Sequence, residues 1–133
     1  MKNQKIILLV TLLISVFCVI SCNKYKSKIT GKVFYIDVND NVERLAAGAI
    51  VAKMVQKGDS LHTVTAVLAN ENGEFLFDRT TKGSWILSGK LTVEEDSTTS
   101  VSYFGLSESF TTSGEDEVQQ IIILKPVIKE DTE

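Results

Sequence analysis

The sequence predicts an all-β domain, an antiparallel β-sandwich built from seven short strands. Runs of alternating apolar and polar residues recur along the chain and are separated by turn-forming Gly and Asn residues. The chain holds one proline and no convincing amphipathic helix. About 110 residues follow the apolar N-terminal segment, which is the usual size of one small domain.

Turn signals divide the predicted strands. Residues 56–60 (QKGDS) favour a hairpin. In the strand after it, Val64, Ala66 and Leu68 alternate with Thr63, Thr65 and Val67. Residues 42–47 are the one place where a short helical turn is an alternative. The seven predicted strands are residues 29–35, 49–55, 61–69, 74–77, 85–93, 101–106 and 118–124.

Alternate apolar positions predict which side chains form the core. From Ile29 to Tyr35 every second residue shares one face, which fits a strand with one buried side. Phe75 and Phe77 share a face two residues apart, so both are predicted to be buried. Four successive aliphatic residues at 121–124 predict a strand covered on both faces, or a sheet edge protected by a neighbour.

The N-terminus has the organisation of a secretory signal. Lys2 and Lys5 precede an apolar run of about 15 residues, shorter than the roughly 20 that a membrane-spanning helix needs. The run ends in Val-Ile-Ser-Cys at residues 19–22, which resembles the lipobox of bacterial lipoproteins. That resemblance implies removal of residues 1–21 and acylation of Cys22, so the predicted membrane contact is a lipid.

This processing limits the chemistry of the mature domain. Cys18 leaves with the signal and Cys22 carries lipid, so no thiol or disulfide remains. Loss of Lys2 and Lys5 leaves twelve basic residues against seventeen acidic ones, a net charge of −5. An acidic domain is a poor partner for nucleic acid or for an anionic membrane surface.

The sequence also predicts the domain boundaries and the location. Residues 22–28 form a lipidated tether, 29–126 the sandwich and 127–133 a charged tail. Surface-displayed lipoproteins of the Bacteroidetes type, which this chain resembles in its domain, tend to carry an acidic cluster soon after the lipidated cysteine. Residues 23–28 (NKYKSK) are basic instead. We therefore expect an outer-membrane lipoprotein facing the periplasm, with surface display as the alternative.

Three motifs resemble the carboxypeptidase-regulatory-like family. They are GKV at residues 31–33, LAAGAIV at 45–51 and ANENGEFLF at 69–77. The resemblance covers residues 29–125 and implies an Ig-like, transthyretin-like sandwich of seven strands. The chain departs from the family pattern at Ala47, where a proline or leucine often precedes the glycine, and at Ala-Asn in place of the usual Thr-Asp. The family does not specify a function.

One loop resembles the start of a calcium site. Asp37, Asn39 and Asn41 match the first three ligand positions of a calcium loop. The match then fails, because Val42 occupies the glycine position and Gly48 the position of the bidentate Glu. These three residues are weak metal candidates, and a solvated loop is the favoured interpretation.

No other residues suggest catalysis or a cofactor. His62 is the only histidine, so neither a zinc site nor a serine triad has a second one to use. The acidic clusters at 94–96 and 115–117 lie in predicted loops and are interpreted as solvated charge. We therefore predict a protein that is not an enzyme and that needs no cofactor.

Two classes of function stay open at this point. The favoured one is a structural or protein-interaction module of the cell envelope with an unidentified protein partner. The alternative is a glycan- or calcium-binding module, which would need Trp85, Tyr103 or the loop of residues 37–41 to be exposed and to converge. A buried Trp85, the preferred interpretation of a lone Trp that opens a strand, favours the first class.

Overall fold

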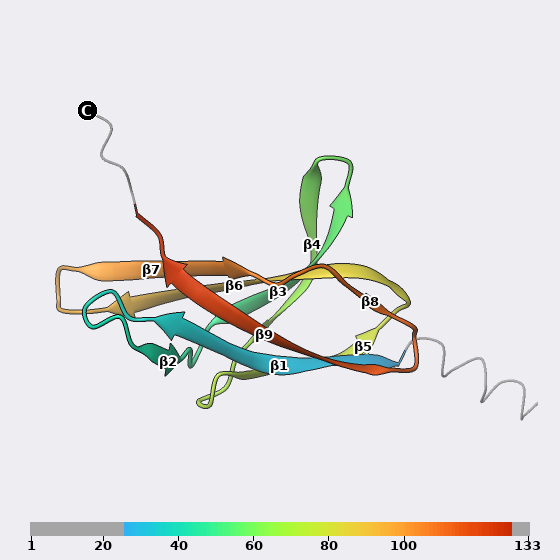
Figure 1. Ribbon diagram of the computed structural model, residues 1–133, viewed down its shortest axis with the longest axis horizontal. Helices are drawn as coiled ribbons and strands as arrows, with labels where there is room; N and C mark the ends of the chain where they lie inside the picture. Colours follow the sequence, from blue (N-terminus) through green and yellow to red (C-terminus); the bar gives the residue numbers. More distant parts are fainter. Residues whose placement is uncertain (1–25, 129–133) are drawn as a thin grey trace, which may run out of the picture.

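The computed structural model describes residues 26–128, which form a two-layer β-sandwich (Figure 1). The predicted signal sequence, Cys18 and Cys22 lie outside the described residues. Within them there are nine strands: β1 (Ser27–Ile36), β2 (Glu43–Leu45), β3 (Ile50–Lys57), β4 (Ser60–Leu68), β5 (Glu74–Thr80), β6 (Gly83–Glu94), β7 (Ser100–Leu106), β8 (Phe110–Thr112) and β9 (Glu117–Pro126).

One layer is built around β1. It pairs antiparallel with β2 near its C-terminal end and with β5 near its N-terminal end, and it runs parallel to β9 along its other edge. The second layer has the order β7-β6-β3-β4, and β8 also pairs with β6. β9 crosses from the first layer to β7 through two residue pairs near Pro126 (Figure 1). The predicted all-β sandwich is confirmed, but its sheet is mixed because β1 and β9 are parallel.

Nine strands replace the predicted seven. All seven predicted segments are strands, and the two additional ones, β2 and β8, have three residues each. β2 lies in the segment for which a helical turn was the alternative. Its residues pair with Phe34–Ile36 of β1, so the sheet edge and not local helix propensity determines the conformation there.

The core lies between the two layers and follows the predicted alternation. Ile29 and Val33 of β1 are fully buried, and Phe75 and Phe77 are almost completely buried. The ring centroids of the two Phe side chains are 6.0 Å apart in an edge-on arrangement. The other core residues are Ala46, Ala49, Val51, Ala69, Leu87, Tyr103, Ile122 and Leu124.

The predicted turn at residues 70–73 is held by a side chain and a glycine. The Asn70 side-chain oxygen accepts hydrogen bonds from the backbone N–H groups of Asn72 and Glu74. Gly73 has a φ of 71°, and a Cβ there would lie 2.6 Å from the Val33 carbonyl oxygen. The turn therefore requires glycine on both conformational and steric grounds.

β1 begins at Ser27, two residues before the predicted start of the domain. The Ser27 side chain is fully buried. Its hydroxyl donates to Asp116 Oδ1 over 2.5 Å and accepts from the Gly114 N–H over 2.8 Å. The first described residues are thus joined to the β8–β9 loop. Residues 26–128 contain no helix that is long and apolar enough to cross a membrane.

Candidate functional site

The loop that resembles a calcium site is organised around an arginine. Arg44 donates from Nε to Asp37 Oδ2 over 3.2 Å and from Nη2 to Asp40 Oδ2 over 2.6 Å. The Val42 N–H, together with Arg44, lowers the pKa of Asp40. The Asn39 side-chain amide donates to Glu95, 2.7 Å away. The guanidinium therefore supplies the positive charge that neutralises both carboxylates.

This arrangement brings two weak metal candidates, Asp37 and Asn39, into hydrogen bonds with other side chains. Asn41, the third, has a φ of 58° and donates its N–H to the Asp37 carbonyl oxygen as part of the turn. Within residues 26–128, no three His, Cys, Asp or Glu side chains lie close enough together to hold a metal ion. The geometry of the loop favours a turn closed by ion pairs.

The aromatic residues named for a glycan site are buried. Trp85 is 7% exposed and donates from Nε1 to Thr112 Oγ1 over 2.9 Å. Tyr103 is 1% exposed, and its ring centroid lies 4.9 Å from that of Tyr35. Buried Trp85 confirms the preferred interpretation. Neither ring is available as a platform for a sugar.

A buried lysine is the main polar feature that the sequence did not single out. Lys53 on β3 is 4% exposed, and its Nζ donates to Thr80 Oγ1 over 3.1 Å. The same Nζ lies 4.8 Å from the ring centroid of Trp85 and 5.4 Å from that of Phe77. Burial lowers the pKa of Lys53. Its position two residues after buried Val51 was the available signal, because alternate residues of a strand share a face.

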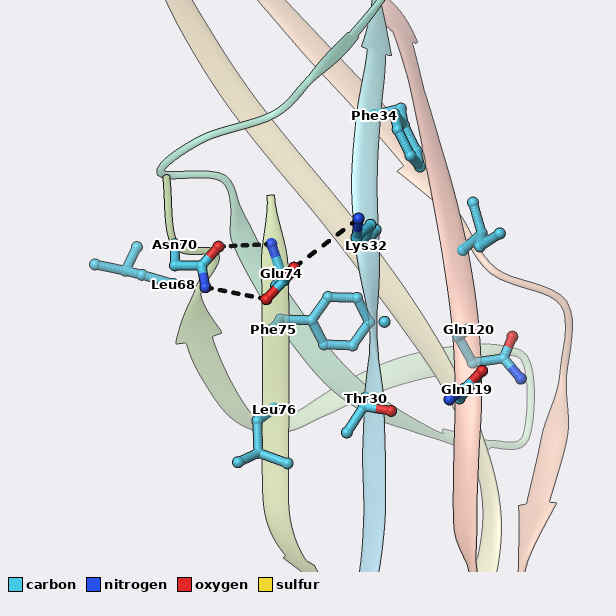
Figure 2. A pocket seen from close by; sticks show the side chains of 12 residues that line it. Thr30, Lys32, Phe34, Leu68, Asn70, Glu74, Phe75, Leu76, Gln119 and Gln120 are labelled. Carbon is cyan, nitrogen blue, oxygen red and sulfur yellow. Dashed lines mark hydrogen bonds and ion pairs between the residues drawn. The ribbon is translucent and has the colours of Figure 1, made fainter. Parts of the chain in front are cut away.

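A groove of about 720 Å³ lies on the outer face of the layer formed by β5, β1 and β9 (Figure 2). Figure 2 shows Leu68 and Leu76 on the β5 side of the groove, Thr30 and Lys32 on β1, and the two glutamines on β9. The lining residues are Thr30, Gly31, Lys32, Phe34, Leu68, Asn70, Glu74, Phe75, Leu76, Gln119, Gln120 and Ile121. The groove therefore combines residues from four strands, β1, β4, β5 and β9, with Asn70 of the β4–β5 connection.

Large aliphatic side chains form its most exposed walls. Leu68 is 70% exposed, Ile121 66% and Leu76 48%, and Ile123, which follows Ile121 on the same face of β9, is 44% exposed. Single exposed aliphatic residues are common on protein surfaces, but several gathered over neighbouring strands mark an interaction surface. We call this set of residues, with Phe34, the outer apolar face.

The charged groups at the groove, Lys32 and Glu74, are paired with each other. Lys32 Nζ lies 3.9 Å from Glu74 Oε1, and the Asn70 amide donates to Glu74 Oε2 over 3.5 Å (Figure 2). Gly31 contributes no side chain, and the Phe75 ring lies so near that a Cβ at Gly31 would come within 2.8 Å of it. The groove thus offers an apolar surface with a neutralised ion pair at one side.

The outer apolar face corrects the prediction made for residues 121–124. Ile122 and Leu124 are fully buried, whereas Ile121 and Ile123 point outward and are exposed. β9 lies between β1 and β7 in the strand order, but it pairs with β7 only at Lys125 and Pro126, and residues 121–124 pair with β1 alone. The second layer covers one face of β9, and no described element covers the other.

Comparison with known proteins shows a distant likeness in fold. No family model and no curated protein matches the chain. A solved structure of a Pseudomonas aeruginosa protein, named provisionally as a carbohydrate-binding protein, matches with a TM-score of 0.54 and 14% identity. That match covers 76% of this chain and 90% of the other.

A second match has a longer chain. The minor pilin GBS52 of Streptococcus agalactiae matches with a TM-score of 0.47 and 13% identity, over 82% of this chain and 48% of the pilin. At such low identities, the Pseudomonas match supports the fold alone. The chain is therefore a small all-β sandwich module with a distant structural likeness to that protein.

Proposed function

We propose that this chain is a lipid-anchored, non-catalytic module of the cell envelope that binds a protein partner through the outer apolar face. Lipid on Cys22 anchors the chain in the outer membrane. The sandwich is transthyretin-like and faces the periplasm. The observation that carries the proposal is the exposure of Leu68, Leu76 and Ile121 around one groove.

The chemistry of the groove favours a protein over a sugar. Sugar rings are recognised by exposed aromatic faces with unpaired polar groups beside them, but the most exposed walls here are aliphatic. The acidic and basic groups, Glu74 and Lys32, are paired with each other. Burying aliphatic surface contributes roughly 25 cal/mol per Å², and an apolar protein surface provides the complementary area. We therefore assign the groove to an envelope protein that presents an apolar segment.

Site-specific photocross-linking in cells tests this assignment. A photoreactive amino acid replaces Ile121 in the full-length chain, and Val38, which is 51% exposed in the β1–β2 turn, receives the same replacement as the control. We expect one discrete protein adduct from position 121 and none of that mass from position 38. A second substitution, Leu76→Glu, should abolish the adduct because it places a charge in the groove. Equal adducts from both positions would contradict the proposal.

The anchor is tested separately. Mass spectrometry of the protein extracted from membranes should show an N-terminal lipopeptide that begins at Cys22, and an unmodified Cys22 would refute lipidation. Protease treatment of intact cells should spare the domain while a surface protein is digested. Degradation of the domain, with a periplasmic protein intact, would place it on the cell surface instead.

Glycan binding remains the second candidate because Phe34 is an aromatic side chain that lines the groove. The glutamines at 119 and 120 supply amides nearby. Retention on immobilised envelope glycans that was lost on Phe34→Ala, with the cross-link from position 121 unchanged, would favour this candidate.

A further inference from the structure

A β-bulge near the end of β5 places two successive charged residues on the outer face of its layer. β5 has one extra residue opposite β1 at this point, so Lys28 stands opposite both Asp78 and Arg79. In a regular strand these two side chains would point to opposite faces. Here both are exposed, while Phe77 and Thr80 on either side of them are buried. The bulge therefore adds the Arg79 side chain to the exposed charges of this face.

The bulge forms one wall of a cleft of about 260 Å³, which is lined by Lys26, Lys28, Asp78 and Arg79. Lys28 Nζ lies 3.9 Å from Asp78 Oδ1, and both side chains are more than half exposed. Such an exposed pair contributes at most about 1 kcal/mol. Within residues 26–128, neither Lys26 nor Arg79 makes an ion pair. The cleft thus offers two unpaired cations beside a weakly held carboxylate.

The cleft lies close to the proposed lipid anchor. Lys26 follows Cys22 by four residues, and four residues of fully extended chain span at most about 14 Å. The headgroup layer on each side of a bilayer is roughly 5–8 Å thick. The tether is therefore short enough to hold the cleft against the lipid headgroups.

The charges at this end of the sandwich favour a ligand without net charge. Acidic residues at 115–117 lie beside β1 on its β9 side, where the Lys28 N–H donates to the Asp116 carbonyl oxygen and Lys28 pairs in register with Glu117. A strongly anionic surface would be repelled by these carboxylates. We propose that the cleft binds the phosphoethanolamine headgroup of a membrane lipid, with the phosphate on Arg79 and Lys26 and the ammonium on Asp78.

Both halves of that headgroup have matching partners in the cleft. The planar guanidinium of Arg79 donates two parallel hydrogen bonds to phosphate oxygens, and the Lys26 ammonium adds a point charge. The primary ammonium of ethanolamine donates to the Asp78 carboxylate. The quaternary ammonium of choline has no N–H to donate, and glycerol brings no positive charge. Phosphatidylethanolamine therefore fits the cleft better than phosphatidylcholine or phosphatidylglycerol.

This contact deepens the proposed function, because it rests on the lipid anchor and determines how the sandwich stands on the membrane. The cleft uses residues 26 and 28 of β1 and residues 78 and 79 of β5. The groove uses residues 30–34 of β1 and 74–76 of β5, further from the tether. With the cleft on the headgroups, the groove lies above the membrane surface and is open to a partner.

Nuclear magnetic resonance of the full-length lipidated protein in nanodiscs tests this contact. The discs contain phosphatidylcholine with an increasing share of phosphatidylethanolamine or, in a second series, of phosphatidylglycerol. The change in the backbone amide shift of Lys28 relative to pure phosphatidylcholine reports binding. Arg79→Gln and Asp78→Asn are compared with two matched controls on the β3–β4 hairpin, Lys57→Gln and Asp59→Asn.

We expect the Lys28 shift to grow with the share of phosphatidylethanolamine and to stay small with phosphatidylglycerol. At a low share, occupancy is proportional to affinity. Arg79→Gln removes a charge-assisted contact, so it should reduce the shift roughly tenfold. Asp78→Asn should reduce it as well, because the preference over choline depends on that carboxylate. The two hairpin variants should behave as the wild type.

A chain that is held on the discs but shows no shift with phosphatidylethanolamine would overturn the proposal. So would an equal or larger shift with phosphatidylglycerol, or a shift that Arg79→Gln leaves unchanged. A chain that does not associate with the discs would refute the anchor and this contact together, whereas the cross-link from position 121 tests the groove separately. Asp78 and Arg79 are exposed, so both variants should keep a melting temperature close to that of the wild type.

Discussion

Replacing Lys53 with methionine should remove a pH dependence of stability that the buried amine creates. Lys53 is 4% exposed, its Nζ donates to Thr80 Oγ1, and within residues 26–128 it makes no ion pair. Burial lowers its pKa. The unfolded chain, in which this lysine is solvated, binds its proton more tightly than the folded one does.

The sign and size of the effect follow from that difference. Between the lowered folded pKa and the ordinary value of 10.5, the unfolded state holds more protons, so the free energy of unfolding rises with pH. Each pKa unit of the lowering contributes about 1.4 kcal/mol. Below the folded pKa the full cost of the buried charge remains. In Lys53→Met that cost is absent, while the hydrogen bond to Thr80, worth about 1 kcal/mol, is lost.

The assay is urea unfolding of wild type and Lys53→Met at pH values from 7 to 10.5, analysed as the difference between the two proteins. At pH 7 we expect Lys53→Met to be as stable as the wild type or up to about 2 kcal/mol more stable. As pH rises, the free energy of unfolding of the wild type should increase relative to that of Lys53→Met. Lys57→Met, at an exposed position on the same strand, is the matched control. The difference in free energy of unfolding between Lys57→Met and the wild type should not change with pH. Parallel curves for Lys53→Met as well would refute the assignment of a lowered pKa to Lys53.

Three further predictions test the fold and the calcium-like loop. Gly31→Ala should destabilise the protein by about 3 kcal/mol or more in denaturant unfolding, because its Cβ would overlap the Gln120 carbonyl oxygen, whereas Gly58→Ala, in open space with φ 62°, should lose only about 1 kcal/mol. Trp85→Phe should cost about 1–3 kcal/mol because Thr112 loses its buried donor, and an unchanged melting temperature would contradict this. EDTA should leave the thermal transition unchanged, and a lowered midpoint would indicate that the loop of residues 37–41 binds a metal after all.

The features that the sequence predicted correctly are those encoded locally. Every second residue of a strand shares a face, so alternation placed Ile29 and Val33 in the core, and Phe75 with Phe77, without knowledge of their neighbours. The turn at residues 70–73 was also predicted, since Asn hydrogen-bonds its own backbone and Gly adopts positive φ. The burial of Trp85 was also predicted correctly, because a lone Trp that opens a strand is more often buried than exposed.

The features that the sequence missed depend on partners distant in the chain. β2 and β8 have three residues each, too few to show a period, and they are strands because β1 and β6 offer edges for them. Parallel pairing of β1 with β9 joins segments about 90 residues apart, and alternation carries no information about strand direction. Lys53 was missed because a charged residue is not expected to be buried without an ion-pair partner.

The alternation of apolar and polar residues also does not reveal whether the apolar face of a strand packs against the rest of the same chain. Val64 continues the alternating pattern of a half-buried strand, yet it is 55% exposed because the β3–β4 hairpin extends away from the two layers (Figure 1). The pattern in β4 is typical of a strand with one buried face, but no other described element packs against Val64 in this fold.

The composition of β9 also exceeds what the fold buries, here on the outer face of the sheet. Successive aliphatic residues at 121–124 are typical of a strand covered on both sides, and the fold covers only the side of Ile122 and Leu124. Ile121 and Ile123 remain exposed on the outer face of the layer, which also carries Leu76 of β5 on the other side of β1. A protein partner seated in the groove would provide the missing second cover, so a strand composition that is costly for the isolated domain becomes favourable in the proposed complex.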